Sequence, residues 1–372
     1  MKRWAVDAGF DRAGIATLEP SENGAVLRRW LARGEHAGME WIGRRIAVRE
    51  DPARLLPGAC SVLCVALQYH PLSGEEEPQG DLWPRVARYA RGRDYHDVMG
   101  RRLRTLAAKI RDAFPGCETR PYVDTGPLLE RELAARAGLG AVAKNTHLLD
   151  RRGGSYFFLG ELLLTLDLEP DEPVADLCGR CTRCLDACPT GALPEPYRLD
   201  SNRCISYWTI EHRGDLPPAA REMVGDWVFG CDVCQEVCPF NQRPPAGSEP
   251  LLRLPDKRRE LDLAGLLALE RDGYVERFQV SPMKRAKLEG LRRNAAVAMG
   301  NRRDPAYVPA LCDALAGGPP VVRRHAAWAL GRIAAAGADD GAARRALLGA
   351  RAPGQDTGVR REIEAALVAA EG

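Results

Sequence analysis

The sequence lacks the long apolar runs and the nucleotide-binding signatures that define several large classes of protein. No uninterrupted apolar run reaches the ~18 residues that a membrane helix requires, and the apolar segment 155–168 is broken by Glu161. There is no GxGxxG after a strand-like segment and no GxxxxGK[ST]. The first residues do not resemble a secretory signal. We therefore expect a soluble cytoplasmic protein, not bound to a membrane, that does not hold NAD or FAD in the Rossmann manner.

Cysteine, by contrast, is concentrated in two dense runs. The first, CGRCTRCLDACP, has the CxxCxxCxxxCP spacing that lets one tight loop present three thiolates to an iron–sulfur cube while the fourth points elsewhere. The second, CDVCQEVCP, is one cysteine short, and a cysteine between the runs completes the number. Eight thiolates suffice for two [4Fe-4S] clusters, and they come from Cys178, Cys181, Cys184, Cys188, Cys204, Cys231, Cys234 and Cys238.

The division of these cysteines between two clusters follows from ferredoxins, in which the last cysteine of each run binds the cluster of the other run. This rule assigns Cys178, Cys181, Cys184 and Cys238 to one cluster, and Cys188, Cys204, Cys231 and Cys234 to the other. The alternative is a pair of structural zinc sites, because CxxC pairs also make tetrahedral zinc sites. Zinc sites do not usually need three cysteines at two-residue gaps followed by CP. Disulfides are disfavoured in the reducing compartment that we expect.

The chain of 372 residues is long enough for two or three domains. Residues 1–168 alternate strand-like and helix-like patterns in the manner of an α/β domain. Residues 169–245 contain the cysteine runs, and residues 246–372 follow a proline-rich linker as a Leu- and Ala-rich helical region. The pattern predicts a multidomain α+β protein with these three domains.

Two segments of the first domain have clear patterns. Residues 61–70 form a continuous apolar run, as in a strand covered on both faces. Residues 94–115 form an amphipathic helix, which Asp94 is placed to cap and Pro115 ends. His96 lies in a DxHxxxG sequence, one residue longer than the DxHxxG loop that supplies a cobalt ligand in some corrinoid proteins. We interpret His96 as part of the helix start.

The best candidate for a catalytic acid in this domain is Asp124. It ends the short strand TRPYVD and precedes a helical pattern in which Asp124 or Thr125 could be the N-cap, with Pro127 in the first turn. A general acid would need burial to raise its pKa, whereas a cap stabilises its helix by ~1 kcal/mol. The residues alone favour the cap. Lys144 and Asn145, in GAVAKN, could bind an anionic cofactor tail or lie on a surface turn.

The C-terminal domain is repetitive and basic. LRRNAAVAMGNRR from Leu291 and VRRHAAWALGRI from Val322 are similar, with Asn294 and His325 at matched positions, as in stacked HEAT-like helices. Residues 251–372 carry 21 Lys and Arg against 15 Asp and Glu, or +6, so the remainder of the chain is at −4. A charge run is often only a solvated face, but this asymmetry favours a polyanion such as RNA phosphate.

With these residues in view, the chain resembles the epoxyqueuosine reductases, cobalamin-dependent iron–sulfur enzymes of transfer-RNA modification. The resemblance covers nearly the whole chain, in the segments DPARLLPGACSV, RDYHDV, YVDTGPLLERELAARAGLGAVAKN, CGRCTRCLDACPTGAL, RCISYWTIEHRG, FGCDVCQEVCP, RRNA and HAAWALG. It implies reduction of epoxyqueuosine to queuosine at the wobble position of tRNA. It also implies a nitroreductase-like cobalamin domain, a ferredoxin-type module with two clusters, and HEAT-like repeats.

The resemblance assigns roles to single residues. Asp124, the aspartate of the VDT motif, would be the proton donor beside the corrin, which reverses the preference for a cap. The cobalamin would be lined by Arg49, Asp124, Lys144, Ser206 and Asp232. The candidates for tRNA binding come from the basic stretch of residues 284–303 and not from the resemblance: Lys284, Arg285, Arg292 and Arg293. In this family no histidine binds the cobalt. An external electron donor is implied, and we expect a monomer.

Two other functions fit part of the sequence. A corrinoid iron–sulfur reductase of a small molecule, similar to the reductive dehalogenases, would not need basic helical repeats. A ferredoxin fused to a helical scaffold would carry electrons without binding a corrinoid. Binding of tRNA and binding of cobalamin, respectively, would distinguish the family activity from these two.

Overall fold

The fold is known from a computed structural model, which describes residues 1–337, 341–351 and 356–371. The chain divides into two compact units that do not follow chain order. The sheet unit contains Met1–Glu76, Gly92–Asn202 and Asp232–Arg253, and the repeat unit contains Glu77–Arg91, Arg203–Cys231 and Leu254–Gly372. These units describe packing, so the boundaries of the three expected domains stay a prediction.

The sheet unit is built on four antiparallel strands in the order β1-β2-β6-β3. Their bounds are β1 Arg12–Thr17, β2 Ser61–Gln68, β3 Thr119–Tyr122 and β6 Phe157–Leu164. Every residue of β2 is buried, which confirms the strand predicted from the apolar run. That run indicated a strand covered on both faces, and it serves here in an antiparallel sheet. The two central strands, β2 and β6, therefore form the core of the unit.

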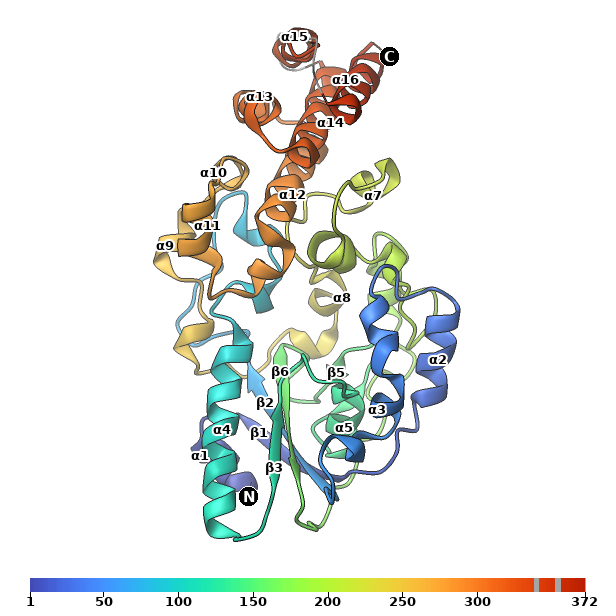
Figure 1. Cartoon of the computed structure of the whole chain (residues 1–372), viewed down its shortest axis with the longest axis vertical. Helices are drawn as coiled ribbons and strands as arrows, with labels where there is room; N and C mark the ends of the chain where they lie inside the picture. Colours follow the sequence, from blue (N-terminus) through green and yellow to red (C-terminus); the bar gives the residue numbers. More distant parts are fainter. Residues whose placement is uncertain (338–340, 352–355, 372) are drawn as a thin grey trace. The chain divides into compact units, whose positions relative to one another are not determined.

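Helices cover both faces of this sheet (Figure 1). α4 (Tyr95–Ala113) packs against β3 and β6, and α5 (Glu130–Arg136) packs against β1, β2 and β6. The sheet approaches α5 so closely that a Cβ atom on Gly14 would lie 1.9 Å from the carbonyl oxygen of Ala137. The unit's other elements are α1 Lys2–Asp7, α2 Gly24–Ala32, α3 Ile46–Glu50, β4 Ala141–Val142, β5 Leu148–Leu149, α6 Arg183–Ala187 and α8 Val233–Glu236.

α4 begins and is buried as its sequence predicts. The carboxylate of Asp94 accepts a hydrogen bond from the His96 backbone N–H at 3.1 Å, which is the expected N-cap. The apolar positions of the helix, Val98, Leu103, Leu106 and Ile110, are all buried. Tyr95 stacks on Phe158 of β6 with ring centroids 4.1 Å apart, which fixes the first turn of the helix against the sheet.

The repeat unit is a stack of helices whose centre is α14. Its long helices are α12 Lys287–Arg302, α13 Val308–Gly317, α14 Pro320–Ala336, α15 Ala342–Gly349 and α16 Thr357–Ala369, preceded by α7 Pro218–Met223, α9 Asp256–Arg259, α10 Leu263–Leu267 and α11 Arg271–Phe278. Gly300 lies against Ala329, and Gly331 lies against Ala366. These two glycines occupy matched positions of the repeats, so the repeat seen in sequence places small residues where neighbouring helices approach closely.

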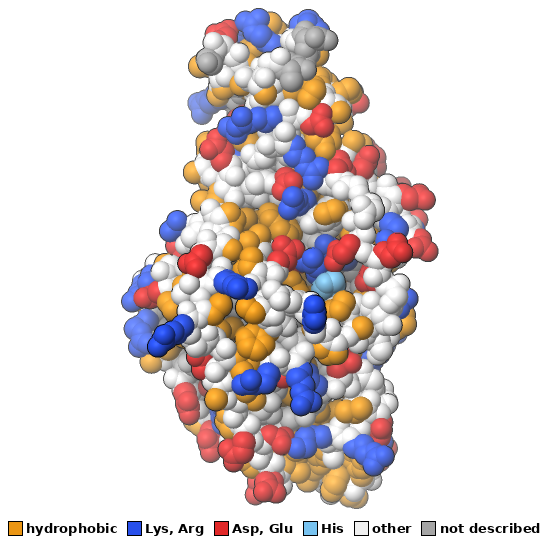
Figure 2. All heavy atoms as spheres, turned by 180° about the vertical axis from the view of Figure 1, so that it is seen from behind, with side chains coloured by type: hydrophobic (Ala, Val, Ile, Leu, Met, Phe, Trp, Pro, Cys, Tyr) orange, Lys and Arg blue, Asp and Glu red, His pale blue; other side chains and the backbone are white. Residues whose placement is uncertain are grey.

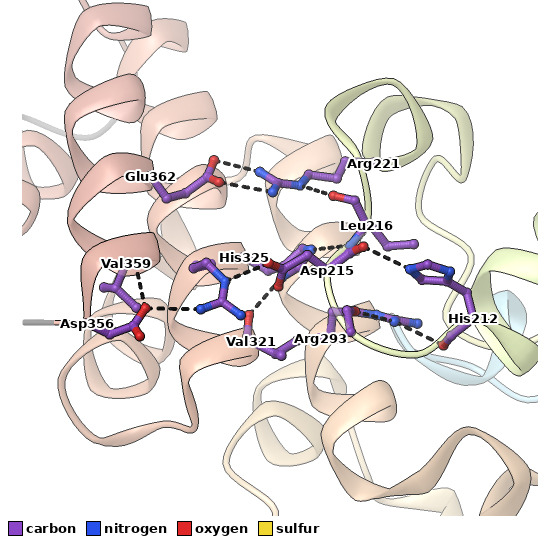
Figure 3. A network of polar contacts seen from close by, with 12 residues as sticks. His212, Asp215, Leu216, Arg221, Arg293, Val321, His325, Asp356, Val359 and Glu362 are labelled. Carbon is purple, nitrogen blue, oxygen red and sulfur yellow. Dashed lines mark hydrogen bonds and ion pairs between the residues drawn. The ribbon is translucent and has the colours of Figure 1, made fainter.

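Matched positions of the repeats also bind one shared segment, Arg203–Cys231. Asn294 donates to the carbonyl oxygens of Thr209 and Val228, both at 2.8 Å. His325 Nε2 accepts from the Leu216 backbone N–H at 3.1 Å (Figure 3). Nearby in Figure 3, Arg221 forms a two-bond ion pair with Glu362 at 2.6 and 3.0 Å. The repeats therefore support a segment that carries two of the eight candidate cluster cysteines.

The buried His325 is expected to make stability depend on pH. Burial and repulsion from Arg221 lower the pKa of His325 to about 3. The unfolded chain protonates this histidine near its ordinary pKa of about 6.5, so stability is complete above that pH and is lost as pH falls towards 3. The loss between pH 6.5 and pH 5 is about 2 kcal/mol. Urea unfolding should show a flatter pH dependence for His325→Asn, because an amide oxygen can also accept a hydrogen bond but does not titrate. Equal slopes for the two proteins would contradict this.

None of the helices in the described ranges is both long enough and apolar enough to cross a membrane.

Candidate functional site

Asp124 lies in a loop between β3 and α5. Its φ of +56° is left-handed, a conformation that aspartate tolerates better than most residues. Its backbone N–H donates to Oε1 of Glu130 at 2.5 Å, and its side chain is 57% exposed. α5 begins only at Glu130, with Leu129 at the N-cap position. The prediction that Asp124 or Thr125 caps this helix is therefore wrong, and the carboxyl group of Asp124 is left to face outwards from a fixed backbone.

One partner of that carboxyl group is His96, on the first turn of α4. His96 Nε2 lies 3.1 Å from Oδ2 of Asp124, and His96 Nδ1 lies 2.6 Å from Oδ1 of Asp94. Burial alone would disfavour the imidazolium, but the hydrogen bonds to Asp124 and Asp94 outweigh it and raise the pKa of His96 to about 9. At neutral pH His96 therefore carries a proton between two carboxylates, and neither ring nitrogen is available to a metal.

Behind the Asp124 loop lies a pair of acids that the sequence reading missed. Glu161, in the middle of β6, is fully buried, and no N–H group of the described residues donates to its carboxyl oxygens. Its polar neighbour is the carboxyl group of Glu130, and two carboxyl groups can hydrogen-bond only when one is protonated. Burial, followed by repulsion from Glu130, raises the pKa of Glu161 well above its usual range. Burial and repulsion from Asp124 raise the pKa of Glu130 to about 7. The sign of this pair in the sequence was Glu161, a single acid within an apolar segment.

Arg49, at the end of α3, belongs to the same group of charges. Its Nε donates to the Ile42 carbonyl at 3.2 Å and its Nη1 to the Leu128 carbonyl at 3.4 Å. Burial lowers the pKa of Arg49, while attraction to Glu130 and Asp124 acts in the opposite direction. The structure thus brings Arg49 and Asp124, which are far apart in the chain, into one electrostatic environment with His96 and Glu130.

Two more of the residues expected near a cofactor, Ser206 and Asp232, have different surroundings. Asp232 is buried at the N-terminus of α8 in the sheet unit. Ser206 is half-buried in the repeat unit, directly before a π-helical turn, Tyr207–Glu211. Such turns are rare and are often found at functional sites.

The cysteine loops of the sheet unit lie close together. α6 packs against α8, and these helices carry Cys184 and Cys234 respectively. All eight candidate cysteines are half-buried and none is in a disulfide. Burial and the charges of Cys178 and Cys181 raise the pKa of Cys238, although Cys238 belongs to the second run. Cys238 therefore lies near the first run, and the division of the cysteines between two clusters stays a prediction. Within the described ranges, no three His, Cys, Asp or Glu side chains converge on a position for a single metal ion.

Lys144 and Asn145 bind these cysteine loops. Both lie in the turn between β4 and β5. The ammonium group of Lys144 donates to the carbonyl oxygens of Gly179 at 2.6 Å and Cys181 at 3.0 Å, and the side chain of Asn145 donates to that of Cys234 at 3.2 Å. The structure thus engages the Lys144 ammonium at the first cysteine loop, and a contact between Lys144 and cobalamin stays a prediction.

The basic residues expected to bind tRNA differ in exposure. Lys284 and Arg285 are exposed, whereas Arg292 is half-buried and donates to the Leu267 carbonyl at 2.7 Å. Arg293 is 1% exposed and donates to the carbonyls of the Arg203–Cys231 segment, so it supports that segment and does not reach a phosphate. On the face shown in Figure 2, Lys and Arg side chains are interspersed with acidic ones and form no continuous patch.

Three family models match the chain. "Epoxyqueuosine reductase QueG, DUF1730" matches residues 49–125, "4Fe-4S double cluster binding domain" matches residues 177–241, and "HEAT repeats" matches residues 284–368. Between them they cover the Asp124 loop, the cysteine runs and the helical stack.

Proteins that are similar to this chain over most of its length are named epoxyqueuosine reductase. The epoxyqueuosine reductase of Xanthomonas campestris pv. campestris is 41% identical over 338 residues, which is 88% of this chain and 93% of that protein. That of Escherichia coli strain K12 is 36% identical over 332 residues, 89% of this chain and 88% of that protein. A crystal structure of epoxyqueuosine reductase with an epoxyqueuosine-modified tRNA-Tyr stem loop is similar over 100% of this chain and 97% of that one, with a TM-score of 0.90 and 32% identity.

Proposed function

Because the chain belongs to the epoxyqueuosine reductase family, we propose that it reduces epoxyqueuosine to queuosine at the wobble position of tRNA, as the last step of queuosine formation. The observation that carries this proposal is the match of 41% identity along almost the whole length of an epoxyqueuosine reductase. The protein is an oxidoreductase. Removal of the epoxide oxygen as water consumes two electrons and two protons, so the site must supply both.

We assign proton delivery to Asp124. Its carboxyl group faces outwards from a loop whose backbone is held by Glu130, and His96 holds a proton 3.1 Å from it. Asp124 would protonate the oxygen as the carbon–oxygen bond breaks, so that hydroxide need not leave as an anion. His96 would then return a proton to Asp124. A flat ligand laid over the loop would remove the water that now surrounds the carboxyl group, and this would raise its pKa as an acid requires.

Electron delivery is assigned to two [4Fe-4S] clusters and a cobalamin. Cobalamin, when bound, supplies the redox chemistry that no protein side chain offers. The residues present fit it: both ring nitrogens of His96 are hydrogen-bonded to carboxylates, and Arg49 lies within the electrostatic reach of Asp124. We propose Arg49, Asp124, Ser206 and Asp232 as its contacts, in a nitroreductase-like domain of residues 1–168.

The clusters are proposed to bind as the spacing of the cysteines indicates. Three observations support cluster binding. The thiols are half-buried and reduced, and the charges of the first run act on Cys238. A backbone N–H also donates to Cys188 Sγ at 3.3 Å. One cluster uses Cys178, Cys181, Cys184 and Cys238, and the other uses Cys188, Cys204, Cys231 and Cys234. An external protein or small reductant must supply the electrons. We propose that the enzyme acts as a monomer in the cytoplasm, where its tRNA substrate is found.

The proposed function is tested by conversion of the modified base. Anaerobically purified protein is loaded with cobalamin and incubated with epoxyqueuosine-containing tRNA and a low-potential reductant, and the nucleosides are then analysed by mass spectrometry. We expect loss of one oxygen from the modified nucleoside. A protein that binds iron and cobalamin but leaves the nucleoside unchanged, and instead dehalogenates a small molecule, would overturn the proposal.

The tRNA is proposed to contact two exposed cations of the repeat unit, Lys284 and Arg285, and the accessible part of the half-buried Arg292. A Lys284→Gln/Arg285→Gln variant should bind tRNA more weakly, and its salt dependence should fall by about one unit of slope for each phosphate that is no longer neutralised. The control is Arg33→Gln, an exposed cation of the sheet unit. Gel shifts at several salt concentrations measure both slopes, and an unchanged slope for the double variant would remove these two residues from the interface.

A further inference from the structure

Lys144 is a buried charge that the proposed proton chemistry does not use. It is 8% exposed, and its ammonium group is held by two carbonyl oxygens of the loop that opens the first cysteine run, those of Gly179 and Cys181. Its backbone N–H also points at Cys178 Sγ, at 3.5 Å. A single residue thus places one full charge at the backbone of the loop between Cys178 and Cys181, and one N–H donor at Cys178 Sγ.

The positive charge of Lys144 is less screened by water than the opposite charge nearby. Asp176, the opposite charge of the loop, accepts from the backbone N–H groups of Cys178 at 3.0 Å and Gly179 at 3.2 Å, but it is exposed to water. The Lys144 carbonyl accepts from the Tyr197 N–H at 2.9 Å, which fixes the turn. Since water screens an exposed charge more strongly than a buried one, Asp176 offsets the positive charge of Lys144 only in part.

We propose that Lys144, through its charge and its backbone N–H, raises the reduction potential of the cluster on Cys178, Cys181, Cys184 and Cys238. A cluster gains one negative charge when it is reduced, and a nearby cation in a poorly screened site stabilises that form. Hydrogen bonds to the cluster sulfurs act in the same direction. The inference rests on the proposed function, because it requires that these cysteines bind iron and sulfur.

Lys144→Gln removes the positive charge but keeps part of the hydrogen bonding that holds the loop, because the amide can still donate to one of the two carbonyl oxygens. The matched control is Arg180→Gln, which removes an exposed cation from the same loop, next to Cys181. Both variants are purified anaerobically as full chains, their iron is measured, and each cluster is titrated with reductant while its EPR signal is followed. If the wild-type protein itself holds no iron, the proposed function fails and not this inference alone.

We expect Lys144→Gln to keep its iron and to shift the reduction equilibrium of one cluster about tenfold towards the oxidised form, which is about 59 mV for one electron. The other cluster should be unchanged, and Arg180→Gln should shift neither by as much. Lys144→Arg, which retains the charge, should keep the wild-type potential. Unchanged potentials in Lys144→Gln, an equal shift in Arg180→Gln, or loss of the cluster from both Lys144 variants would overturn the proposal.

Discussion

Replacing Asp124 by asparagine is expected to lower turnover on tRNA by at least about 100-fold, which is the lower end of what a positioned general acid contributes. Asparagine has almost the same shape, so it can keep the left-handed backbone and the N–H bond to Glu130. It cannot give up an acidic proton. Iron content, the cobalamin spectrum and tRNA affinity should therefore remain those of the wild-type protein. Single-turnover rates, read by nucleoside mass spectrometry, measure the loss.

Asp97→Asn is the matched control for this experiment. Asp97 is an exposed acid on the first turn of α4, next to His96 in sequence but outside its hydrogen bonds. Its replacement removes a nearby charge without removing the proposed donor, so the rate should change little. If Asp124→Asn turned over as fast as the wild-type protein, Asp124 would have no part in proton delivery.

The parts of the fold that sequence predicted are those set by local periodicity. The apolar run of β2 and the amphipathic pattern of α4 are each determined by residues next to one another in the chain. The cap of Asp94 on α4 is equally local. The helical repeat that matches Asn294 with His325 was also visible, because stacking repeats reuse the same small residues at each close approach.

The start of α5 could not be predicted in this way. The sequence around Asp124 contains a suitable cap and a proline at the right distance, yet the helix begins only at Glu130. The reason is long-range: Glu130 binds the Asp124 N–H and lies against Glu161 of β6, a strand that follows much later in the chain. No single-sequence pattern reveals which of several acids will meet across a sheet.

Charge was the feature that sequence predicted least well. Arg292 and Arg293 are adjacent, and a tally of cations treats them alike, but Arg293 faces the Arg203–Cys231 segment and is buried by it. Lys144 was expected to contact a cofactor, and nothing in the sequence indicated that its ammonium group binds the carbonyls of a cysteine loop. In both cases the partner is backbone, whose polar groups are the same at every position and leave no mark in the sequence.

The second large effect is expected from the cysteines, and it tests how the two runs share the clusters. Cys238→Ala should empty the cluster that also uses Cys178, Cys181 and Cys184, although those three remain, because a cluster that loses one of four thiolates becomes exposed and labile. Turnover on tRNA should fall to background, since the electron path is cut. Cys60→Ala, an exposed cysteine outside both runs, is the control and should keep all of its iron.

Double variants then show which cysteines act together. If Cys184 and Cys238 bind one cluster, Cys184→Ala/Cys238→Ala should lose no more iron than either single variant and should retain the EPR signal of the second cluster. Cys184→Ala/Cys188→Ala should lose both clusters, although these two cysteines lie in one run. The opposite result, in which the pair within one run leaves a cluster and the pair across the runs leaves none, would mean that each run binds its own cluster.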